Sequence, residues 1–337
     1  PPPPPPLFFF HAHPAIRPFC LSRGLGDVYK RQALLRNVEL RIGGQKIDKQ
    51  SNTWMNVWTE LTHSNEQKKL LDVLCGSRSN VINFTQGGTT TSTTEINVPL
   101  QFSFCRNPGL AIPLIALQYH EVEISVEFAA REEIVDDAAT QAPALTNVSL
   151  WADYIFLDTA ERKTFAQNPH EYLIETVQTA NAALGAGGAT SGQQTLNLTF
   201  NHPVKELVWV NRTQGGNAAG DNFTNFTSAD TFTATSASNI GTCGLKLNGQ
   251  DRFSSRPGEY FRQVQPYQHH TGSPAVGINC YSFALKPEEH QPSGTCNFSR
   301  IDNAELNVQN LSANTGCLLY TSPSPRDRQK SRVPGWG

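Results

Sequence analysis

The chain has 337 residues, a formal net charge of −2 at pH 7 and only 17% charged residues. No run of residues approaches the roughly 18–20 apolar residues of a membrane-spanning helix. The length accommodates two small domains or one large domain.

The two ends of the chain do not resemble parts of a folded protein. Six prolines open the sequence, and the last residues are rich in Ser, Pro and Arg. Ser22–Gln32 can be encoded by a DNA word whose reverse complement, read from its second base, encodes Cys317–Arg326 followed by Asp or Glu. That word resembles a transposase-type sequencing-library adaptor. We therefore interpret residues 1–32 and 317–337 as non-native, adaptor-derived segments.

Without these segments the composition changes. About 19 basic and 27 acidic residues remain, so the body of the protein carries a charge near −8, which argues against a nucleic-acid-binding surface. His11 and His13 look like half a metal site of a cupin-type jelly roll, but both belong to the N-terminal segment that we interpret as non-native, so we exclude them. Five widely spaced cysteines stay, which indicates free thiols in a reducing compartment rather than a disulfide framework. They are Cys75, Cys105, Cys243, Cys280 and Cys296.

The first part of the body mixes strand and helix signals. Val38–Ile42 alternates apolar and charged residues before a Gly-Gly pair, which predicts a strand and a tight turn. Trp54–Leu61 and Leu70–Leu74 repeat apolar residues at helical spacing, which predicts a short helical excursion with a glycine stop. Val98–Phe104 alternates again and predicts the next strand.

Strand signals continue beyond this point. Two prolines limit any helix in Asn107–Leu117 to a turn or two. Val122–Phe128 alternates apolar with acidic or polar residues, which predicts a half-buried antiparallel strand. Val148–Asp158 predicts another strand, Thr159–Pro169 a short charged connector, and His170–Gln178 a return to strand patterning.

The second part repeats this organisation. Thr195–Val210 predicts two strands around a turn, and residues 211–242, rich in Asn, Thr, Gly and Ser, predict a long surface loop. Gly244–Phe253 predicts a strand and a turn at Asn248-Gly249, and the sequence from Ile278 predicts two further strands. Short alternating runs between Gly, Pro and Asn are typical of an all-β sandwich or barrel rather than of a βαβ protein.

Several residues invite a chemical interpretation. His120-Glu121 looks like part of a zinc-protease helix, but Ile124 occupies the place of the second histidine, and strand geometry separates the pair. The carboxylates of Glu132-Glu133 and Asp136-Asp137 suit a glycosidase, yet their position predicts a solvated turn. We therefore expect no catalytic residues among them.

Histidines and cysteines also cluster near the end of the body. His269-His270, Cys280, His290 and Cys296 do not match a standard metal-ligand spacing, so we interpret them as loop histidines and core thiols. Gly87-Gly88 and Gly215-Gly216 lie in loops and form no phosphate-binding motif. Eight Asn-x-Ser/Thr sequons are expected to be mostly accidental in an Asn/Thr-rich chain: Asn83, Asn147, Asn197, Asn211, Asn222, Asn225, Asn297 and Asn310.

Five phrases occur in this order along the chain: "LRIGGQKIDKQ", "VPLQFSFCRNPGLAIPLIALQYHEVEISVEF", "DYIFLDTAERKTFAQNPHEYLIE", "RPGEYFRQVQPYQHHTGSP" and "YSFALKPEEHQPSGTCNFSRIDNAEL". Together they resemble the major capsid protein of the nucleocytoplasmic large DNA viruses, the group that includes iridoviruses and phycodnaviruses. The resemblance extends from about Val38 to Leu306.

This resemblance implies an all-β double jelly roll, truncated at both ends, in which two antiparallel sandwiches stand side by side. Residues 33–160 would form the first jelly roll without its N-terminal strands, and residues 161–316 the second without its C-terminal strand. The family implies a structural protein and not an enzyme, with no catalytic, cofactor-binding or metal-binding residues and no cofactors.

The resemblance also implies partners. In the family three copies form a pseudo-hexagonal capsomer, and capsomers tile an icosahedral shell over an internal membrane. The expected partners are therefore two further copies, neighbouring capsomers and minor capsid proteins, without direct nucleic-acid contact, in a virion assembled in the host cytoplasm. The alternative is a carbohydrate-binding or glycan-cleaving β-sandwich, which would need an aromatic cleft or a carboxylate pair. Double jelly-roll capsid proteins of smaller viruses are a nearer alternative.

Overall fold

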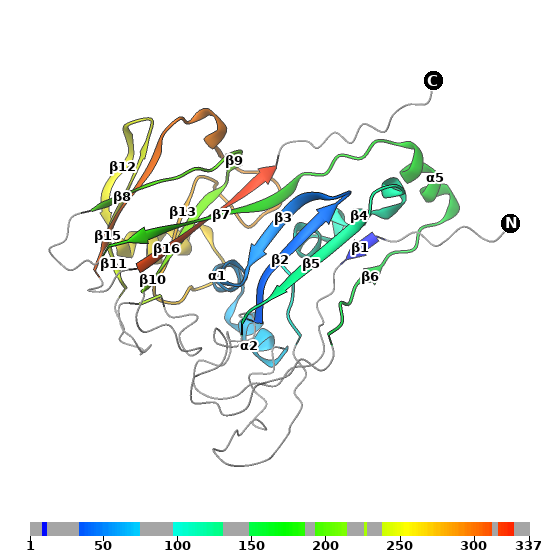
Figure 1. Cartoon of the computed structure of the whole chain (residues 1–337), viewed down its shortest axis with the longest axis horizontal. Coiled ribbons are helices and arrows are strands. Elements are labelled where there is room, and N and C mark those ends of the chain that lie inside the picture. Colours follow the sequence, from blue (N-terminus) through cyan, green and yellow to red (C-terminus); the bar gives the residue numbers. More distant parts are fainter. Residues whose placement is uncertain are drawn as a thin grey trace, which may run out of the picture.

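Two antiparallel β-sandwiches lie side by side in the structure (Figure 1). The computed structural model describes residues 9–11, 34–74, 97–130, 148–185, 193–213, 226–227, 238–311 and 316–326. The predicted all-β class is confirmed, and the described helices are short.

The first sandwich consists of two three-stranded sheets, with the strand orders β3-β2-β5 and β4-β1-β6. Its strands are β1 (Phe9–His11), β2 (Leu35–Ile42), β3 (Gln45–Ser51), β4 (Ile112–Pro113), β5 (Val122–Phe128) and β6 (Asp153–Tyr154). The intervening helices are α1 (Asn52–Thr62), α2 (Asn65–Leu74), α3 (Ser103–Arg106), η2 (Pro108–Leu110) and η3 (Leu114–Leu117), and α5 (Thr159–Gln167) follows the sandwich.

Local sequence explains how this sandwich begins. Gly43 and Gly44 have φ values of 57° and 77°, a left-handed conformation that glycine adopts without steric cost, and they turn β2 into β3. The Ser51 hydroxyl accepts a hydrogen bond from the Trp54 N–H at 3.2 Å and thereby caps the start of α1. The predicted strand and helical excursion are therefore confirmed.

The second sandwich consists of two four-stranded sheets, with the strand orders β13-β10-β16-β7 and β12-β11-β15-β8, beside a short β14-β9 pair. Its strands are β7 (Ile174–Leu184), β8 (Gln194–Asn197), β9 (Pro203–Val204), β10 (Glu206–Thr213), β11 (Ile240–Leu247), β12 (Gln250–Pro257), β13 (Ile278–Ser282), β14 (Cys296–Asn297), β15 (Ala304–Asn310) and β16 (Gly316–Arg326). Its helices are η5 (Tyr260–Val264), α6 (Gln265–His269) and η6 (Phe298–Arg300).

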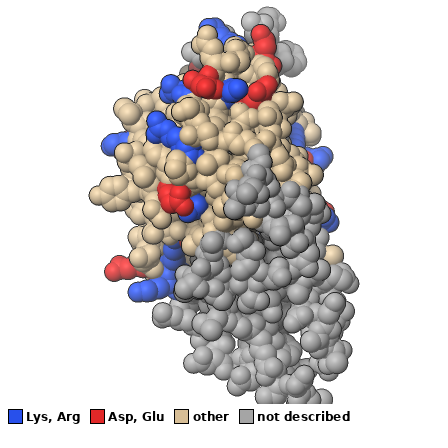
Figure 2. All heavy atoms as spheres, turned by 90° about the vertical axis from the view of Figure 1, so that its left-hand side faces the viewer, with Lys and Arg blue, Asp and Glu red and all other residues tan. Residues whose placement is uncertain are grey.

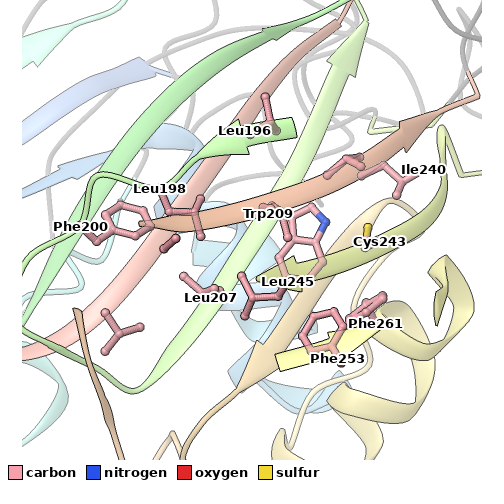
Figure 3. Packing of buried hydrophobic residues seen from close by; sticks show 14 of the residues in the cluster. Leu196, Leu198, Phe200, Leu207, Trp209, Ile240, Cys243, Leu245, Phe253 and Phe261 are labelled. Atoms are coloured by element: carbon pink, nitrogen blue, oxygen red, sulfur yellow. The ribbon is translucent and has the colours of Figure 1, made fainter. Parts of the chain in front are cut away.

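The core of the second sandwich fills the space between its two sheets (Figure 3). Trp209 from β10 points toward Leu245 on the facing strand β11 (Figure 3), and its ring lies 5.3 Å from that of Phe261. The predicted turn between β11 and β12 is confirmed at Asn248 and Gly249, which have φ values of 51° and 78°. The first sandwich has its own buried cluster, which includes Leu40 and Phe102.

Three sequence predictions of local structure were wrong in part. Val98–Phe104 buries alternate apolar side chains but forms no strand, and its last residues turn into α3. Within Val148–Asp158 only Asp153 and Tyr154 belong to a sheet. The expected connector Thr159–Pro169 contains the helix α5, which begins with a capping box between Asp158 and Glu161. Alternation reports which side chains are buried, but a ladder also needs a neighbouring strand in register.

The segments interpreted as non-native also include described residues. Within residues 1–32 the structure describes only β1, which pairs with β4 and β6. Residues 317–326 extend β16, which pairs with β7 along its whole length and with β10 up to Thr321. The prediction that these residues are adaptor-derived concerns their origin and stays a prediction.

The predicted surface loop of residues 211–242 lies largely outside the described residues, apart from the end of β10, residues 226–227 and residues 238–242.

Candidate functional site at the contact between the two sandwiches

The pair His120-Glu121 has a structural role beside the turn between β2 and β3. Both residues are exposed and precede β5. The Glu121 carbonyl accepts a hydrogen bond from the Gly43 N–H at 2.8 Å, and the His120 ring lies so close to Gly43 that a Cβ there would stand 2.6 Å from Nδ1. The pair therefore packs against the turn between β2 and β3.

The histidines and cysteines near the end of the body separate into different environments. Cys280 is a buried core thiol, as predicted, and Cys296 is half-buried. The interpretation of His270 as a loop histidine was wrong in one respect, because its side chain is completely buried. His269 contacts the Leu285 carbonyl at 3.0 Å. Within the described part of the chain, no group of three or more His, Cys, Asp or Glu residues is arranged to hold a metal ion.

The predicted sequons also differ in their surroundings. Asn211 and Asn310 are completely buried and their side chains lie 3.2 Å apart, so neither can carry a glycan in the folded protein. Asn197 and Asn297 are exposed. Four sequons lie outside the described residues: Asn83, Asn147, Asn222 and Asn225. The carboxylates considered for a glycosidase and the glycine pairs considered for phosphate binding also lie outside them: Glu132, Glu133, Asp136, Asp137, Gly87, Gly88, Gly215 and Gly216.

Apolar, hydrogen-bonded and charged side chains are buried together where the two sandwiches meet. Helix α1 of the first sandwich packs against the sheet of the second that contains β7, β10 and β13. The rings of Trp54 and Trp58 contact each other at a tilt of 32°, with ring centroids 5.3 Å apart. They bury their surface together with Val208 and Ile278. Because burial of large apolar side chains stabilises an interface by about 1.5–3 kcal/mol each, α1 joins the sandwiches firmly.

Buried polar groups fix the register of this contact. The Asp48 carboxylate in the middle of the edge strand β3 accepts a hydrogen bond from the Val177 N–H on β7 at 2.9 Å. Gln50 donates to the same carboxylate at 2.9 Å. Burial raises the pKa of Asp48, while these hydrogen bonds act in the opposite direction. Moving β7 relative to the first sheet would leave the buried Asp48 carboxylate and the Val177 N–H without this hydrogen bond, which is costly in the interior.

Three alternating charges cross the contact. Glu175 on β7 binds Arg106 of the first sandwich at 3.1 Å and Lys205 of the second in a close ion pair. Lys205 has no exposed surface, and it also donates to the Glu289 carbonyl at 2.9 Å. The Arg106 guanidinium lies 4.9 Å from the Trp58 ring, which places the cation over an aromatic face. Glu175 therefore links both sandwiches through its two oxygens.

A loop of the second sandwich closes the same contact from another side. The Gly272 N–H donates to the Leu61 carbonyl at the end of α1, at 2.7 Å. The Lys68 ammonium on α2 donates to Glu60 and to the Ser273 carbonyl, at 2.7 and 2.9 Å. A Cβ at position 272 would stand 2.5 Å from two backbone oxygens of α1, so only glycine fits here.

A buried histidine holds the base of this loop. His270 lies 3.2 Å from Glu206 at the start of β10 and 3.0 Å from Glu288. Burial by itself disfavours the charged imidazole, but the carboxylates and the contact with Cys280 outweigh it and raise the pKa of His270 to about 12. His270 is therefore a charged member of the structure at neutral pH.

These features form the joint between the two sandwiches. The hollow between α1 and β10 that Trp54, Val57 and Val208 line measures about 10 Å³, which is room for at most one water molecule. No helix in the described part of the chain is long and apolar enough to cross a membrane. Sequence reasoning missed Arg106, Glu175, Lys205 and Glu206. The one available signal was the pair Lys205-Glu206 directly before the apolar residues of β10, since charged side chains beside a buried strand need partners of opposite charge.

The surface at the far end of the second sandwich carries scattered charges. Figure 2 shows Lys, Arg, Asp and Glu distributed singly or in small mixed groups among uncharged residues on this face. A basic stripe of the kind that binds nucleic acid does not occur among the described residues of this view.

Comparisons with known proteins place this geometry in a family. Residues 161–321 match the model of the large eukaryotic DNA virus major capsid protein, and residues 26–158 match that of the major capsid protein N-terminus. The major capsid protein of Pyramimonas orientalis virus is 42% identical over 85% of this chain and 72% of its own length. That of Paramecium bursaria Chlorella virus 1 is 41% identical over 88% of this chain and 70% of its own length.

Solved structures agree with these sequence relatives. A chain of the PBCV-1 virus capsid superposes with a TM-score of 0.77 at 32% identity and covers 95% of this chain and 86% of its own. The Faustovirus major capsid protein superposes with a TM-score of 0.67 at 14% identity, over 94% of this chain and 73% of its own, and supports the fold alone.

Proposed function

The chain belongs to the large eukaryotic DNA virus major capsid protein family, and from this premise we propose how it builds a shell. Its fold is the double jelly roll predicted from the sequence, and its function is that of a structural major capsid protein of the virion. The carbohydrate-binding or glycan-cleaving alternative is not supported, because the relatives are capsid proteins.

We propose that three copies associate into a pseudo-hexagonal capsomer and that capsomers tile an icosahedral shell. The observation that carries this proposal is the joint between the sandwiches, where Glu175 binds both Arg106 and Lys205. Two sandwiches that move as one body give each copy two similar faces, so three copies present six sandwiches around one axis. Closed rings of identical copies are a common solution for such contacts.

The finer expectations follow from the same proposal. Neighbouring capsomers and minor capsid proteins are the proposed partners, nucleic acid is not contacted directly, and an internal membrane lies beneath the shell. Assembly takes place in the host cytoplasm, and the protein has no catalytic role. The proposed division places the first jelly roll in residues 33–160 and the second in residues 161–316.

Native mass spectrometry combined with light scattering tests the capsomer. We expect a trimer at micromolar concentration for the chain completed with the flanking sequence of a relative. A monomer over the whole micromolar range would contradict the proposal.

A further inference from the structure

The hairpin and helix of the first sandwich have a counterpart in the second. The turn Gly43-Gly44 joins β2 to β3, which runs into α1, and the turn Asn248-Gly249 joins β11 to β12, which runs into the helix of η5 and α6. The sequences at the two turns are "LRIGGQ" and "LKLNGQ". The first strand of each hairpin also pairs with a later strand, β5 or β15. The two sandwiches therefore repeat one structural unit.

Both helices bury one side chain in the core of their own sandwich. Met55 and Phe261 each stand four residues after the last residue of the preceding strand, and neither has exposed surface. Met55 belongs to the core of the first sandwich and Phe261 to that of the second. Because this residue fixes the rotation of each helix, residues at equal distances after it lie on corresponding faces of the two helices.

The face beside this buried residue has different surroundings in the two sandwiches. Trp58 and Leu61 stand seven and ten residues after β3 and are buried in the joint against β10 and β13. Val264 and Tyr267 stand at the same two positions after β12 but are 40% and 89% exposed. One helix therefore buries on a neighbouring sandwich the face that the other helix leaves in water.

Leu285 enlarges this exposed apolar surface. It is 74% exposed, and its carbonyl contacts the His269 ring at the end of α6 at 3.0 Å. We call Val264, Tyr267 and Leu285 the Tyr267 face. Its side chains present on the order of 300 Å², which is a substantial part of the roughly 800 Å² that each partner contributes to a standard protein interface.

Charged side chains next to the Tyr267 face are paired within the chain. Glu259 binds Arg262 at 2.7 Å, and Glu289 binds Lys286 at 2.7 Å. Acidic residues outnumber basic ones in the body of the protein, so two copies repel each other where unpaired carboxylates meet. An apolar face bordered by paired charges therefore fits another copy of the chain better than a basic partner, which would need free carboxylates.

We propose that the Tyr267 face docks on the first sandwich of a second copy, as α1 docks on the second sandwich within the chain. Helix α1 packs on the sheet β13-β10-β16-β7. The corresponding sheet of the first sandwich is β4-β1-β6, where Tyr154 in β6 and Phe156 directly after it are 45% and 67% exposed. Two different surfaces meet in this contact, so it repeats around a ring and closes with three copies. This inference rests on the proposed trimer and names its contact.

Hydroxyl-radical footprinting tests the contact in the completed chain that is used for native mass spectrometry. Oxidation of individual side chains is compared between the trimer and the monomer obtained by dilution. We expect oxidation of Tyr267 to slow at least about fivefold in the trimer, because the centre of an interface excludes water. Tyr119 is 93% exposed and lies beside the turn between β2 and β3, so its oxidation is expected to stay the same.

Variants test whether the contact drives assembly. Val264→Asp combined with Tyr267→Asp places two charges in the face and alters no core residue, so the urea midpoint of the diluted protein is expected to stay unchanged. The concentration at which half of the chains form trimers is expected to rise at least about tenfold. Tyr119→Asp is the matched control and is expected to leave assembly unchanged.

Three results would overturn the inference. A trimer in which Tyr267 is oxidised as fast as in the monomer, and which the double variant still forms, would remove this contact and leave the proposed trimer intact. A dimer that the double variant abolishes would show that the Tyr267 face packs on itself. A completed chain that stays monomeric would overturn the trimer together with its contact, so the two failures are distinguishable.

Discussion

Glu175 offers the sharpest test of the joint between the sandwiches. Glu175→Gln keeps the shape of the side chain and removes its charge from between Arg106 and Lys205. Coulomb's law at an effective dielectric constant near 20 gives about 5 kcal/mol for the contact with Arg106 at 3.1 Å, most of which desolvation offsets in the intact protein. The variant leaves Lys205 fully buried without a counter-charge, so we expect the free energy of unfolding to fall by about 3–5 kcal/mol.

Urea unfolding followed by Trp fluorescence measures this change. Glu127→Gln is the matched control, because its partner Arg36 lies 3.6 Å away and both side chains are about half exposed, so the loss is expected to stay below about 1 kcal/mol. Glu175→Gln combined with Lys205→Met is expected to recover part of the loss, since no unpaired ammonium is then buried. If Glu175→Gln behaves like the control and the double variant shows no coupling, the ion network does not join the sandwiches.

Two further predictions address the loop that closes the joint. Gly272→Ala is expected to destabilise the protein by about 1–3 kcal/mol and to speed exchange at the end of α1, because its Cβ would overlap the carbonyls of Glu60 and Leu61; unchanged exchange in α1 would contradict the close fit. The pKa of His270 rises from 6.5 to about 12 on folding, so its stabilising contribution is complete below about pH 6.5 and declines as the pH rises toward 12. His270→Gln is therefore expected to flatten the loss of stability in urea titrations between about pH 7 and 10, and an unchanged slope would exclude His270 as its source.

Elements with strong local signals were predictable from the sequence. The turn at Gly43-Gly44 and the alternation of β5 need only neighbouring residues to define them, and the structure confirms both. Val98–Phe104 shows the limit of such signals, because its alternation is satisfied by burial in the core without a partner strand. The helix α5 was missed although its capping box stands in the sequence, since charged residues suggested a connector.

The joint could not be predicted in the same way. Arg106, Glu175 and Lys205 are separated by 69 and 30 residues along the chain, and only the fold brings them together. The histidine that sequence reasoning placed in a loop is buried because Glu206 and Glu288 arrive from other elements. Polar residues at such a contact carry no periodic signature, so a single sequence indicates at most that a buried charge needs a partner.

The joint matters because a capsid subunit assembles more readily when its two sandwiches already have a fixed relative orientation. In the proposed shell, many weak contacts between capsomers are multiplied by symmetry, so each must form without a large loss of conformational freedom. Two sandwiches on a flexible linker would have to be ordered again at every assembly step, and that ordering opposes association. Helix α1 and Glu175 order them once, during folding of the single chain. The buried charges add to the apolar contacts of α1, because a relative orientation that separated Glu175 from Lys205 would leave a buried charge without its partner.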